Sequence, residues 1–246
     1  MNMETSVAEI KHITKSFGTR VVLKDVDFKI EKGENLVVFG KSGSGKSVLI
    51  KCMAGLLSPD DGEVLMLGEK IEGLKNQELN LLRKRIGFLF QSAALYDSMT
   101  VKENLEFPLR DLKKKKKDEI DALVMEALKN VGLEDAINKM PSELSGGMRK
   151  RIGLARTLIL KPEIILYDEP TTGLDPITSK EISELILEIQ KKYNTASVII
   201  THDVECARIV ANRIIIIKDG MLTAQGTFKE LSESNDKWVR SFFNHN

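Results

Sequence analysis

The feature that most constrains this chain is a glycine-rich loop of eight residues. The loop reads Gly40-Lys41-Ser42-Gly43-Ser44-Gly45-Lys46-Ser47, which matches the pattern G-x-x-x-x-G-K-[S/T] in full. It follows the apolar run at residues 36–39 and opens a helix-forming stretch, which is the context that the pattern requires. The glycines let backbone N–H groups turn inward around phosphate oxygens, and the helix N-terminus adds partial positive charge. We therefore predict a phosphate-binding loop between a strand and a helix.

The end of this loop and a second, acidic element supply the chemistry that a nucleoside triphosphate needs. Lys46 can reach the β- and γ-phosphates, the Ser47 hydroxyl can ligate Mg²⁺, and Val48 is predicted to contact the nucleotide next to them. A short apolar run further along the chain reads as a buried strand that ends in Asp168 and Glu169. Asp168 can hold Mg²⁺ directly or through water, and Glu169 can orient or deprotonate the attacking water. The two elements together predict hydrolysis of ATP with Mg²⁺.

Strand-like and helix-like segments alternate through most of the chain. Apolar runs and period-two alternation predict strands, and apolar residues at helical spacing predict amphipathic helices. The predicted strands cover residues 26–30, 36–39, 86–90, 164–167, 197–200, 213–217 and 221–224. The predicted helices cover residues 47–57, 120–131, 146–160 and 182–189, and a turn at residues 60–62 follows the first of them. This order predicts an α/β fold with a mostly parallel sheet covered on both faces, an antiparallel sheet from the early strands, and a helical subdomain at about residues 92–161.

The composition argues against several functional classes. The chain has 37 basic and 36 acidic residues and a formal net charge of +1, which argues against binding nucleic acid through bulk charge. Two cysteines, Cys52 and Cys206, are too few for a disulfide framework, and Cys52 is interpreted as a packing residue. The apolar runs are far shorter than the roughly 20 residues of a membrane-spanning helix. Five lysines at residues 113–117 are interpreted as a solvated helix start or as a contact for anionic lipid head groups.

A second glycine motif narrows the class. Residues 144–148 read Leu-Ser-Gly-Gly-Met ahead of a predicted helix, and here the chain resembles the ATP-binding cassette (ABC) family, whose signature is LSGGQ. Four further positions match motifs of this family, and the motifs occur along the chain in the family's order. They are Phe17 for the aromatic that stacks on adenine, Gln91 for the Q-loop, Asp175 for the D-loop and His202 for the switch histidine. The resemblance implies that residues 1–246 form one ABC ATPase domain with a RecA-like, mostly parallel core sheet. Taken alone, Phe17 would sooner be read as a core residue.

The resemblance also implies a role for each of these residues. Three residues at the N-terminus of the signature helix would present a hydroxyl and backbone N–H groups to the γ-phosphate of ATP bound by another subunit; they are Ser145, Gly146 and Gly147. A competent ATPase would then be a homodimer, and Asp175 would act across it. Gln91 would touch the Mg²⁺ shell and link it to the helical subdomain, and His202 would hydrogen-bond the γ-phosphate. Met148 in place of glutamine puts in doubt any contact that the glutamine side chain makes.

The segment after Gln91 points to a subfamily. Residues 90–104 and 107–110, together with the LSGGM variant, resemble the MlaF-type ATPases of bacterial Mla/Mce phospholipid transporters. The resemblance implies an ATPase homodimer beneath two MlaE-like permease subunits, with an Mce-domain protein across the membrane and a small STAS-domain partner. It places the chain at the cytoplasmic face of the bacterial inner membrane, held there through the permease.

Two other classes remain open at this point. The first is the ATPase of an importer for polar solutes such as amino acids, many of which carry a regulatory domain after the cassette. The second is a non-transport ABC ATPase of translation or DNA maintenance, which usually has two cassettes or a long coiled-coil insertion. A P-loop kinase would leave the LSGGM motif, Asp175 and His202 unexplained. The tail at about residues 227–246 carries Trp238, Phe242 and Phe243, and it is expected either to pack on its own domain or to reach the dimer partner.

Overall fold

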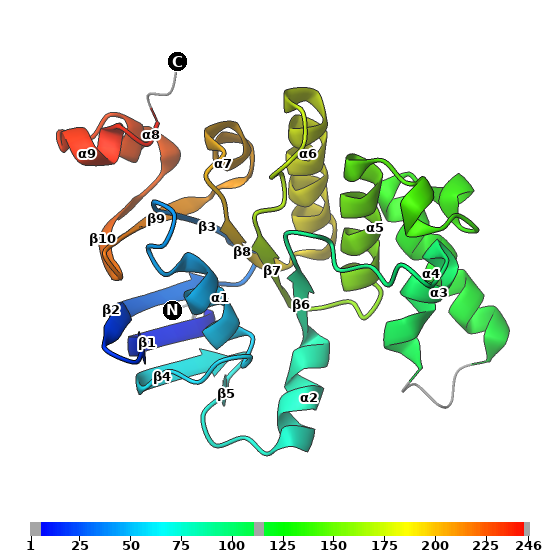
Figure 1. Ribbon diagram of the computed structural model, residues 1–246, viewed down its shortest axis with the longest axis horizontal. Helices are drawn as coiled ribbons and strands as arrows, with labels where there is room; N and C mark the ends of the chain where they lie inside the picture. The colour runs from blue at the N-terminus through cyan, green and yellow to red at the C-terminus, as the bar shows by residue number, and fades with distance from the viewer. Residues whose placement is uncertain (1–5, 111–115, 244–246) are drawn as a thin grey trace, which may run out of the picture.

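A six-stranded sheet forms the centre of the computed structural model, which describes residues 6–110 and 116–243 (Figure 1). In spatial order its strands are β10 (Met221–Gly226), β9 (Arg213–Lys218), β3 (Asn35–Phe39), β8 (Ala196–Ile200), β7 (Ile164–Asp168) and β6 (Ile86–Leu89). Neighbouring strands from β9 to β6 pair in parallel, and β10 pairs with β9 in the antiparallel sense. The prediction of a mostly parallel core sheet is therefore confirmed.

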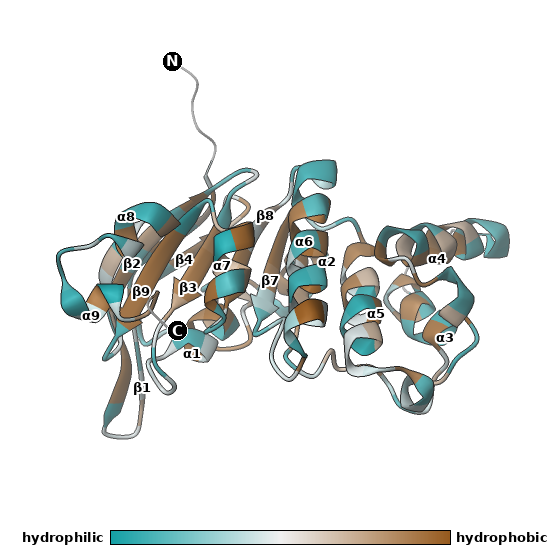
Figure 2. Cartoon of the chain, turned by 90° about the horizontal axis from the view of Figure 1, so that it is seen from above, coloured by the Kyte–Doolittle hydropathy of each residue, from teal (hydrophilic) through white to brown (hydrophobic). Residues whose placement is uncertain are grey.

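Alternate residues of the central strands belong to opposite faces of this sheet. In β3, Val37 and Phe39 join one apolar cluster, whereas Leu36 and Val38 join a second. Side chains that alternate in this way can be buried throughout a strand only when both faces are covered. Figure 2 shows the apolar strands lying between the helices and the smaller sheet. The predicted cover on both faces is confirmed.

The helices divide between the two clusters. The first cluster receives residues from α3 (Val101–Glu106), α4 (Lys117–Val131), α5 (Gly146–Leu158), α6 (Pro176–Tyr193), α7 (Val204–Val210), α8 (Phe228–Ser232) and α9 (Lys237–Arg240). The second receives residues from α1 (Lys46–Met53) and α2 (Asn76–Arg85). Short 3₁₀ turns occur at Phe107–Leu109, Glu134–Ala136 and Pro141–Glu143. Helices α3, α4 and α5 lie together at one end of the molecule (Figure 1), within the segment where a helical subdomain is predicted.

The early strands form a separate antiparallel sheet, as predicted. Its spatial order is β2 (Arg20–Glu31), β1 (Ser6–Phe17), β4 (Asp61–Met66) and β5 (Glu69–Lys70). Its inner face joins the second cluster through Ile10, Val26 and Ile30, each at most 1% exposed. Leu49 of α1 lies in the same cluster, so the helix that follows the phosphate loop packs between the two sheets.

Several element boundaries differ from the sequence prediction, and two of these differences have a clear cause in the backbone. Helix α1 ends at Met53 rather than at residue 57, because the chain turns through Gly55 at a φ of 64°. The turn predicted at residues 60–62 is the beginning of β4, where Asp61 pairs with Thr14 of β1. A Cβ on Gly62 would lie 2.5 Å from the Lys11 carbonyl oxygen, so glycine at this position permits the close approach of the two strands.

The aromatic tail packs on its own chain. The Phe243 ring lies 5.5 Å from the Phe39 ring and 5.2 Å from the Phe228 ring, in edge-on arrangements. Phe242 stacks on Phe39 at 6.3 Å, and Trp238 meets Phe242 at 4.9 Å. Of the two predicted placements of the tail, the structure favours local packing.

Two further features concern the membrane. Among the described residues, none of the helices is both long and apolar enough to cross a bilayer. Three of the five lysines at residues 113–117 lie outside the described residues, and Lys117 begins α4. The proposed contact of this run with anionic lipid stays a prediction.

Candidate nucleotide-binding site

The phosphate loop connects the carboxyl end of β3 to α1. Two of its glycines have a positive φ, 78° at Gly43 and 104° at Gly45. A Cβ on Gly45 would lie 2.8 Å from the Val22 carbonyl oxygen, so the loop can approach β2 this closely only with glycine. The N-cap residue of α1 is Gly45, which offers no side chain to the first N–H groups of the helix. Those donors are therefore available to an anion.

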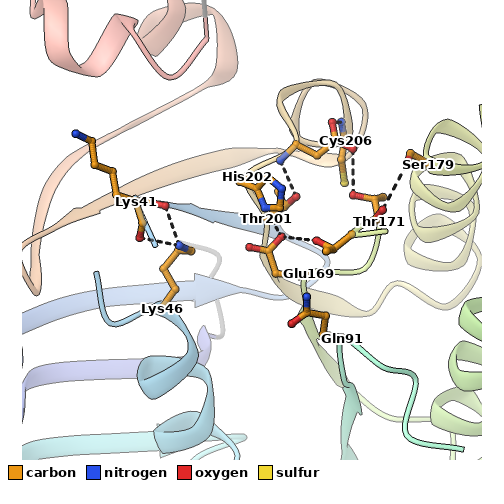
Figure 3. A network of polar contacts seen from close by, with 12 residues as sticks. Lys41, Lys46, Gln91, Glu169, Thr171, Ser179, Thr201, His202 and Cys206 are labelled. Carbon is orange, nitrogen blue, oxygen red and sulfur yellow. Dashed lines mark hydrogen bonds and ion pairs between the residues drawn. The ribbon is translucent and has the colours of Figure 1, made fainter. Parts of the chain in front are cut away.

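Lys46 lies folded back onto the loop. Its Nζ donates to the Gly40 carbonyl oxygen at 2.7 Å and to the Lys41 carbonyl oxygen at 3.1 Å (Figure 3). The side chain is 8% exposed. Burial lowers the pKa of the ammonium group, while Glu169 and Asp168 oppose this shift. A phosphate within the loop would offer the ammonium group a charged partner in place of two carbonyls.

The two predicted acids stand at the carboxyl end of β7, beside β8. Asp168 is half-buried, and its pKa is raised first by burial and then by the neighbouring Glu169. Glu169 has a φ of 52°, and its backbone N–H donates to the Ile200 carbonyl oxygen at 2.9 Å. This left-handed conformation is uncommon outside glycine and marks a position that its surroundings hold in place.

The Glu169 side chain has two polar neighbours. Its Oε2 accepts a hydrogen bond from Thr172 Oγ1 at 3.1 Å and lies 2.8 Å from His202 Nδ1. The carboxylate side chain is 16% exposed, whereas the His202 side chain is 69% exposed. Figure 3 shows Glu169 between His202 and Gln91. The arrangement gives a shielded carboxylate whose partners orient it at the edge of an open cleft.

One cleft of about 640 Å³ brings most of the predicted site residues together. The predicted residues that line it are Phe17, Gly40, Ser42, Gly43, Gly45, Lys46, Ser47, Val48, Gln91, Asp168, Glu169 and His202. Lys41 and Ser44 belong to the loop without lining the cleft. Phe17 is 49% exposed at the cleft, which favours the aromatic platform over a core position. The cleft wall also contains Thr172, from the segment at residues 172–175 that matches the family's D-loop. Arg20 and Val22, which the sequence did not single out, complete this wall.

The signature residues and Asp175 lie outside this cleft. Ser145 is the N-cap of α5, where its Oγ accepts a hydrogen bond from the Met148 N–H at 3.2 Å. Asp175 is the N-cap of α6, and its pKa is lowered first by a hydrogen bond from the Thr178 hydroxyl at 2.6 Å and then by bonds from the N–H groups of Thr178 and Ile177. Gly146 and Gly147 form the first turn of α5. One chain therefore carries the phosphate loop and the signature at separate places.

Sequence reasoning missed Lys150, a lysine that is only 6% exposed. Its Nζ donates to the Gln91 carbonyl oxygen at 2.5 Å and to the Glu169 carbonyl oxygen at 3.1 Å. A signal was present, because position 150 falls on the same helix face as Gly147 and Leu154, which are both buried. A lysine on a buried helix face requires a polar partner, and here it has two.

A family comparison agrees with this geometry. The sequence model of the ABC transporter family matches residues 23–172, which include the phosphate loop, the signature and both acids. The chain belongs to this family, and it is an ATP-binding and ATP-hydrolysing cassette.

Over nearly its whole length, the chain is similar to relatives that are named for different transported substrates. The probable ribonucleotide transport ATP-binding protein mkl of Mycobacterium leprae is 44% identical and covers 96% of this chain and 68% of its own length. The chloroplastic protein TRIGALACTOSYLDIACYLGLYCEROL 3 of Arabidopsis thaliana is 42% identical over 95% of this chain and 72% of its own length. The intermembrane phospholipid transport protein MlaF of Haemophilus influenzae is 39% identical over 98% and 91%. The methionine import protein MetN of Clostridium tetani is 40% identical over 91% and 70%.

Solved structures give the same architecture. The dimeric ATP-binding cassette MJ0796, in a post-hydrolysis state with ADP and Pi, is 34% identical and superposes with a TM-score of 0.82 over 90% of this chain and 98% of its own. A subunit of the cbiONQ ABC transporter complex from Clostridium perfringens is 29% identical, with a TM-score of 0.87 over 97% and 94%. The predicted ABC-type fold is confirmed.

Proposed function

We propose that this chain is the ATPase subunit of a phospholipid transporter of the Mla/Mce type. The observation that carries the proposal is the similarity to MlaF, which extends over 98% of this chain and 91% of that protein. The plant relative also has a lipid name, whereas mkl and MetN are named for other substrates. The chain would lie at the cytoplasmic face of the bacterial inner membrane, bound to MlaE-like permease subunits and joined by Mce-domain and STAS-domain partners.

The working unit would be a homodimer. The phosphate loop and the signature of one chain lie apart, and the related cassette MJ0796 is dimeric with ADP and Pi bound. Ser145, Gly146 and Gly147 of each chain would face the γ-phosphate held by the other, and Asp175 would lie near this contact. Two ATP molecules would thus close the dimer, and loss of phosphate would remove the contacts that hold it closed.

The cleft offers a consistent set of ligands for Mg²⁺. Ser47, Gln91 and Asp168 all line it, and Asp168 is a half-buried carboxylate beside a second carboxylate. A cation there would offset the raised pKa of Asp168, which burial and Glu169 cause. When bound, the ion would neutralise charge on the β- and γ-phosphates.

Hydrolysis would proceed by in-line attack of water on the γ-phosphorus. The oxygen of water forms the new bond as the bond to the β–γ bridging oxygen breaks. Glu169 orients the water and accepts its proton, while His202 holds the γ-phosphate and the Glu169 carboxylate together. Lys46 and the backbone N–H groups of the loop stabilise the charge that develops. The helices that follow Gln91 would pass the movement to the permease.

The Glu169→Gln variant tests this assignment. We expect it to bind ATP, to lose turnover and to accumulate as a closed dimer in size-exclusion chromatography with ATP. The matched control is Glu188→Gln on the exposed face of α6, which should hydrolyse ATP as the unchanged protein does. Normal steady-state hydrolysis by Glu169→Gln would remove Glu169 from the mechanism.

The transported substrate needs a separate experiment. Purification of the complex from its native membrane, with partners and lipids identified by mass spectrometry, should yield an Mce-domain protein and bound phospholipid. Recovery with a lone periplasmic solute-binding protein would support a polar-solute importer instead. Recovery without a permease would support a non-transport ATPase.

A further inference from the structure

Lys150 of α5 connects three segments that have separate roles in the proposed mechanism: the signature helix, the loop that carries Gln91 and the end of β7 that carries Glu169. Its helix begins at the signature, and its ammonium group bonds to carbonyl oxygens of Gln91 and Glu169 at 2.5 and 3.1 Å. The side chain is buried, and within residues 6–110 and 116–243 it forms no hydrogen bond or ion pair with the side chain of Asp168 or Glu169. Its role in the mechanism is therefore distinct from that of Lys46.

The two carbonyl groups occupy equivalent places at the edge of the sheet. Leu89 of β6 and Tyr167 of β7 form the last paired position of these strands. Gln91 and Glu169 each stand two residues beyond it, where strand pairing has ended. Lys150 therefore bridges the two chain segments at the point where the sheet itself no longer holds them together.

The loop after β6 is seated on α5 by further contacts. Arg156 donates from Nη1 to the Ala94 carbonyl oxygen at 2.8 Å and from Nη2 to the Ala93 carbonyl oxygen at 3.0 Å. Between Lys150 and Arg156, Gly153 leaves room for Ala93, since a Cβ there would lie 2.8 Å from the Ala93 Cβ. The loop is thus fixed to one helix face, and Lys150 extends that attachment to Glu169.

The backbone of Glu169 is held on both sides. Its N–H donates to the Ile200 carbonyl oxygen of β8, and its carbonyl oxygen accepts from Lys150. Between these two bonds the residue keeps a φ of 52°. A backbone held in this region fixes the direction in which the side chain leaves the main chain.

We propose that Lys150 is a positioning residue for ATP hydrolysis, which ties the Glu169 backbone to the Gln91 loop so that the carboxylate stays aimed at the attacking water. The inference rests on the proposed role of Glu169. Because Lys150 belongs to α5, displacement of this helix by the membrane partner alters the position of both carbonyl groups at once. Hydrolysis then depends on the seating of the helical segment against the sheet.

The test compares Lys150→Met, which keeps the length of the side chain without its donors, with Lys150→Arg, which keeps the cation. The matched control is Arg151→Met, which removes a neighbouring cation that bonds to Val131 and Glu181 rather than to the site. We expect Lys150→Met to lower kcat by about 10–100-fold, the scale of a small misplacement of a catalytic group. KM and the Kd for ATP should change by less than about twofold, because the phosphate loop is untouched.

The kinetics of these variants decide the inference. Partial recovery of kcat in Lys150→Arg, with Arg151→Met near the unchanged protein, supports it. A kcat within about twofold of the unchanged protein in Lys150→Met overturns it, and so does a parallel loss of kcat, ATP affinity and melting temperature. Adding Lys150→Met to Glu169→Gln should cause no further loss, since both act through one carboxylate. If Glu169→Gln hydrolyses ATP normally, the proposed function of Glu169 fails. If Glu169→Gln loses hydrolysis but Lys150→Met hydrolyses ATP normally, only the inference about Lys150 fails.

Discussion

Replacement of Gly153 by alanine measures how tightly the loop after β6 is seated on α5. In an open helix interior this change stabilises a protein by about 1 kcal/mol, because alanine is the better helix former. At position 153 the added Cβ would lie 2.8 Å from the Ala93 Cβ and 3.0 Å from Leu89 Cδ1. The Leu89 methyl group is the end of a flexible side chain and can move aside. Ala93 cannot, because its N–H donates to the Phe90 carbonyl oxygen and its own carbonyl oxygen accepts from Arg156.

The magnitude follows from two opposing terms. Overpacking by one methyl group in a fixed core costs about 1–3 kcal/mol. Subtracting the gain in helix propensity leaves Gly153→Ala destabilised by roughly 1 kcal/mol, or about 2–4 °C in melting temperature for a chain of this size. Thermal and urea unfolding of the apo protein measure this change directly. A variant that is more stable than the unchanged protein by about 1 kcal/mol would refute the tight seating of the loop.

The Ala93→Gly change provides the matched control. It removes the atom that the new Cβ would meet, and glycine adopts the φ of 61° at this position without strain. The double variant should therefore recover at least half of the stability that Gly153→Ala loses. Two variants whose effects simply add would show that the destabilisation arises elsewhere in α5.

Further predictions concern the phosphate loop and the tail. Lys46→Ala should lose affinity for ATP, and equal binding of ATP in calorimetry would contradict the assigned role. The pKa of Lys46 is lowered, chiefly by burial, so ATP affinity should begin to fall with rising pH below the ordinary lysine pKa of 10.5. Between the lowered pKa and 10.5 the unfolded chain binds more protons at this lysine than the folded chain does. The contribution of Lys46 to the free energy of unfolding therefore rises with pH over this interval. Lys46→Arg should move the loss of affinity to higher pH. Phe243→Ala should cost about 3–5 kcal/mol in unfolding experiments, because the ring is 8% exposed against Phe39. Truncation after Asn235 should cost at least as much, and a weaker ATP-dependent dimer in the truncated protein alone would indicate that the tail also reaches the partner.

The strongly patterned elements were predictable from the sequence. Apolar runs such as the one in β3 are buried on both sides, and a run of this kind bounded by glycine has few other structures available. The loop after it was predictable from its glycine pattern, and the structure explains one of these glycines, since a Cβ on Gly45 would lie 2.8 Å from the Val22 carbonyl oxygen of β2. Elements whose sequence pattern has a single local cause can therefore be predicted from the sequence.

Elements that depend on distant partners were not predictable. The helix α2 is mostly polar, and Leu82 is its one buried residue. Asp61 and Gly62 have the composition of a turn, yet pairing with β1 makes them a strand. The helical pattern places Lys150 on a buried face of α5, but only the arrangement of β6 and β7 supplies the two carbonyl groups that it bridges.

The methionine of the signature has a structural consequence for the proposed dimer. The Met148 side chain packs against the apolar cluster of α5, while its N–H caps the helix by donating to Ser145 Oγ. That bond uses a lone pair of the Ser145 hydroxyl and leaves its proton free to donate to an anion. The anion site proposed at the start of α5 would thus depend on Ser145 and backbone N–H groups and would need nothing from the side chain at position 148. Met148→Gln should accordingly leave the hydrolysis rate nearly unchanged, and a large gain in ATP affinity in a binding titration would show that a side chain at this position contacts the nucleotide.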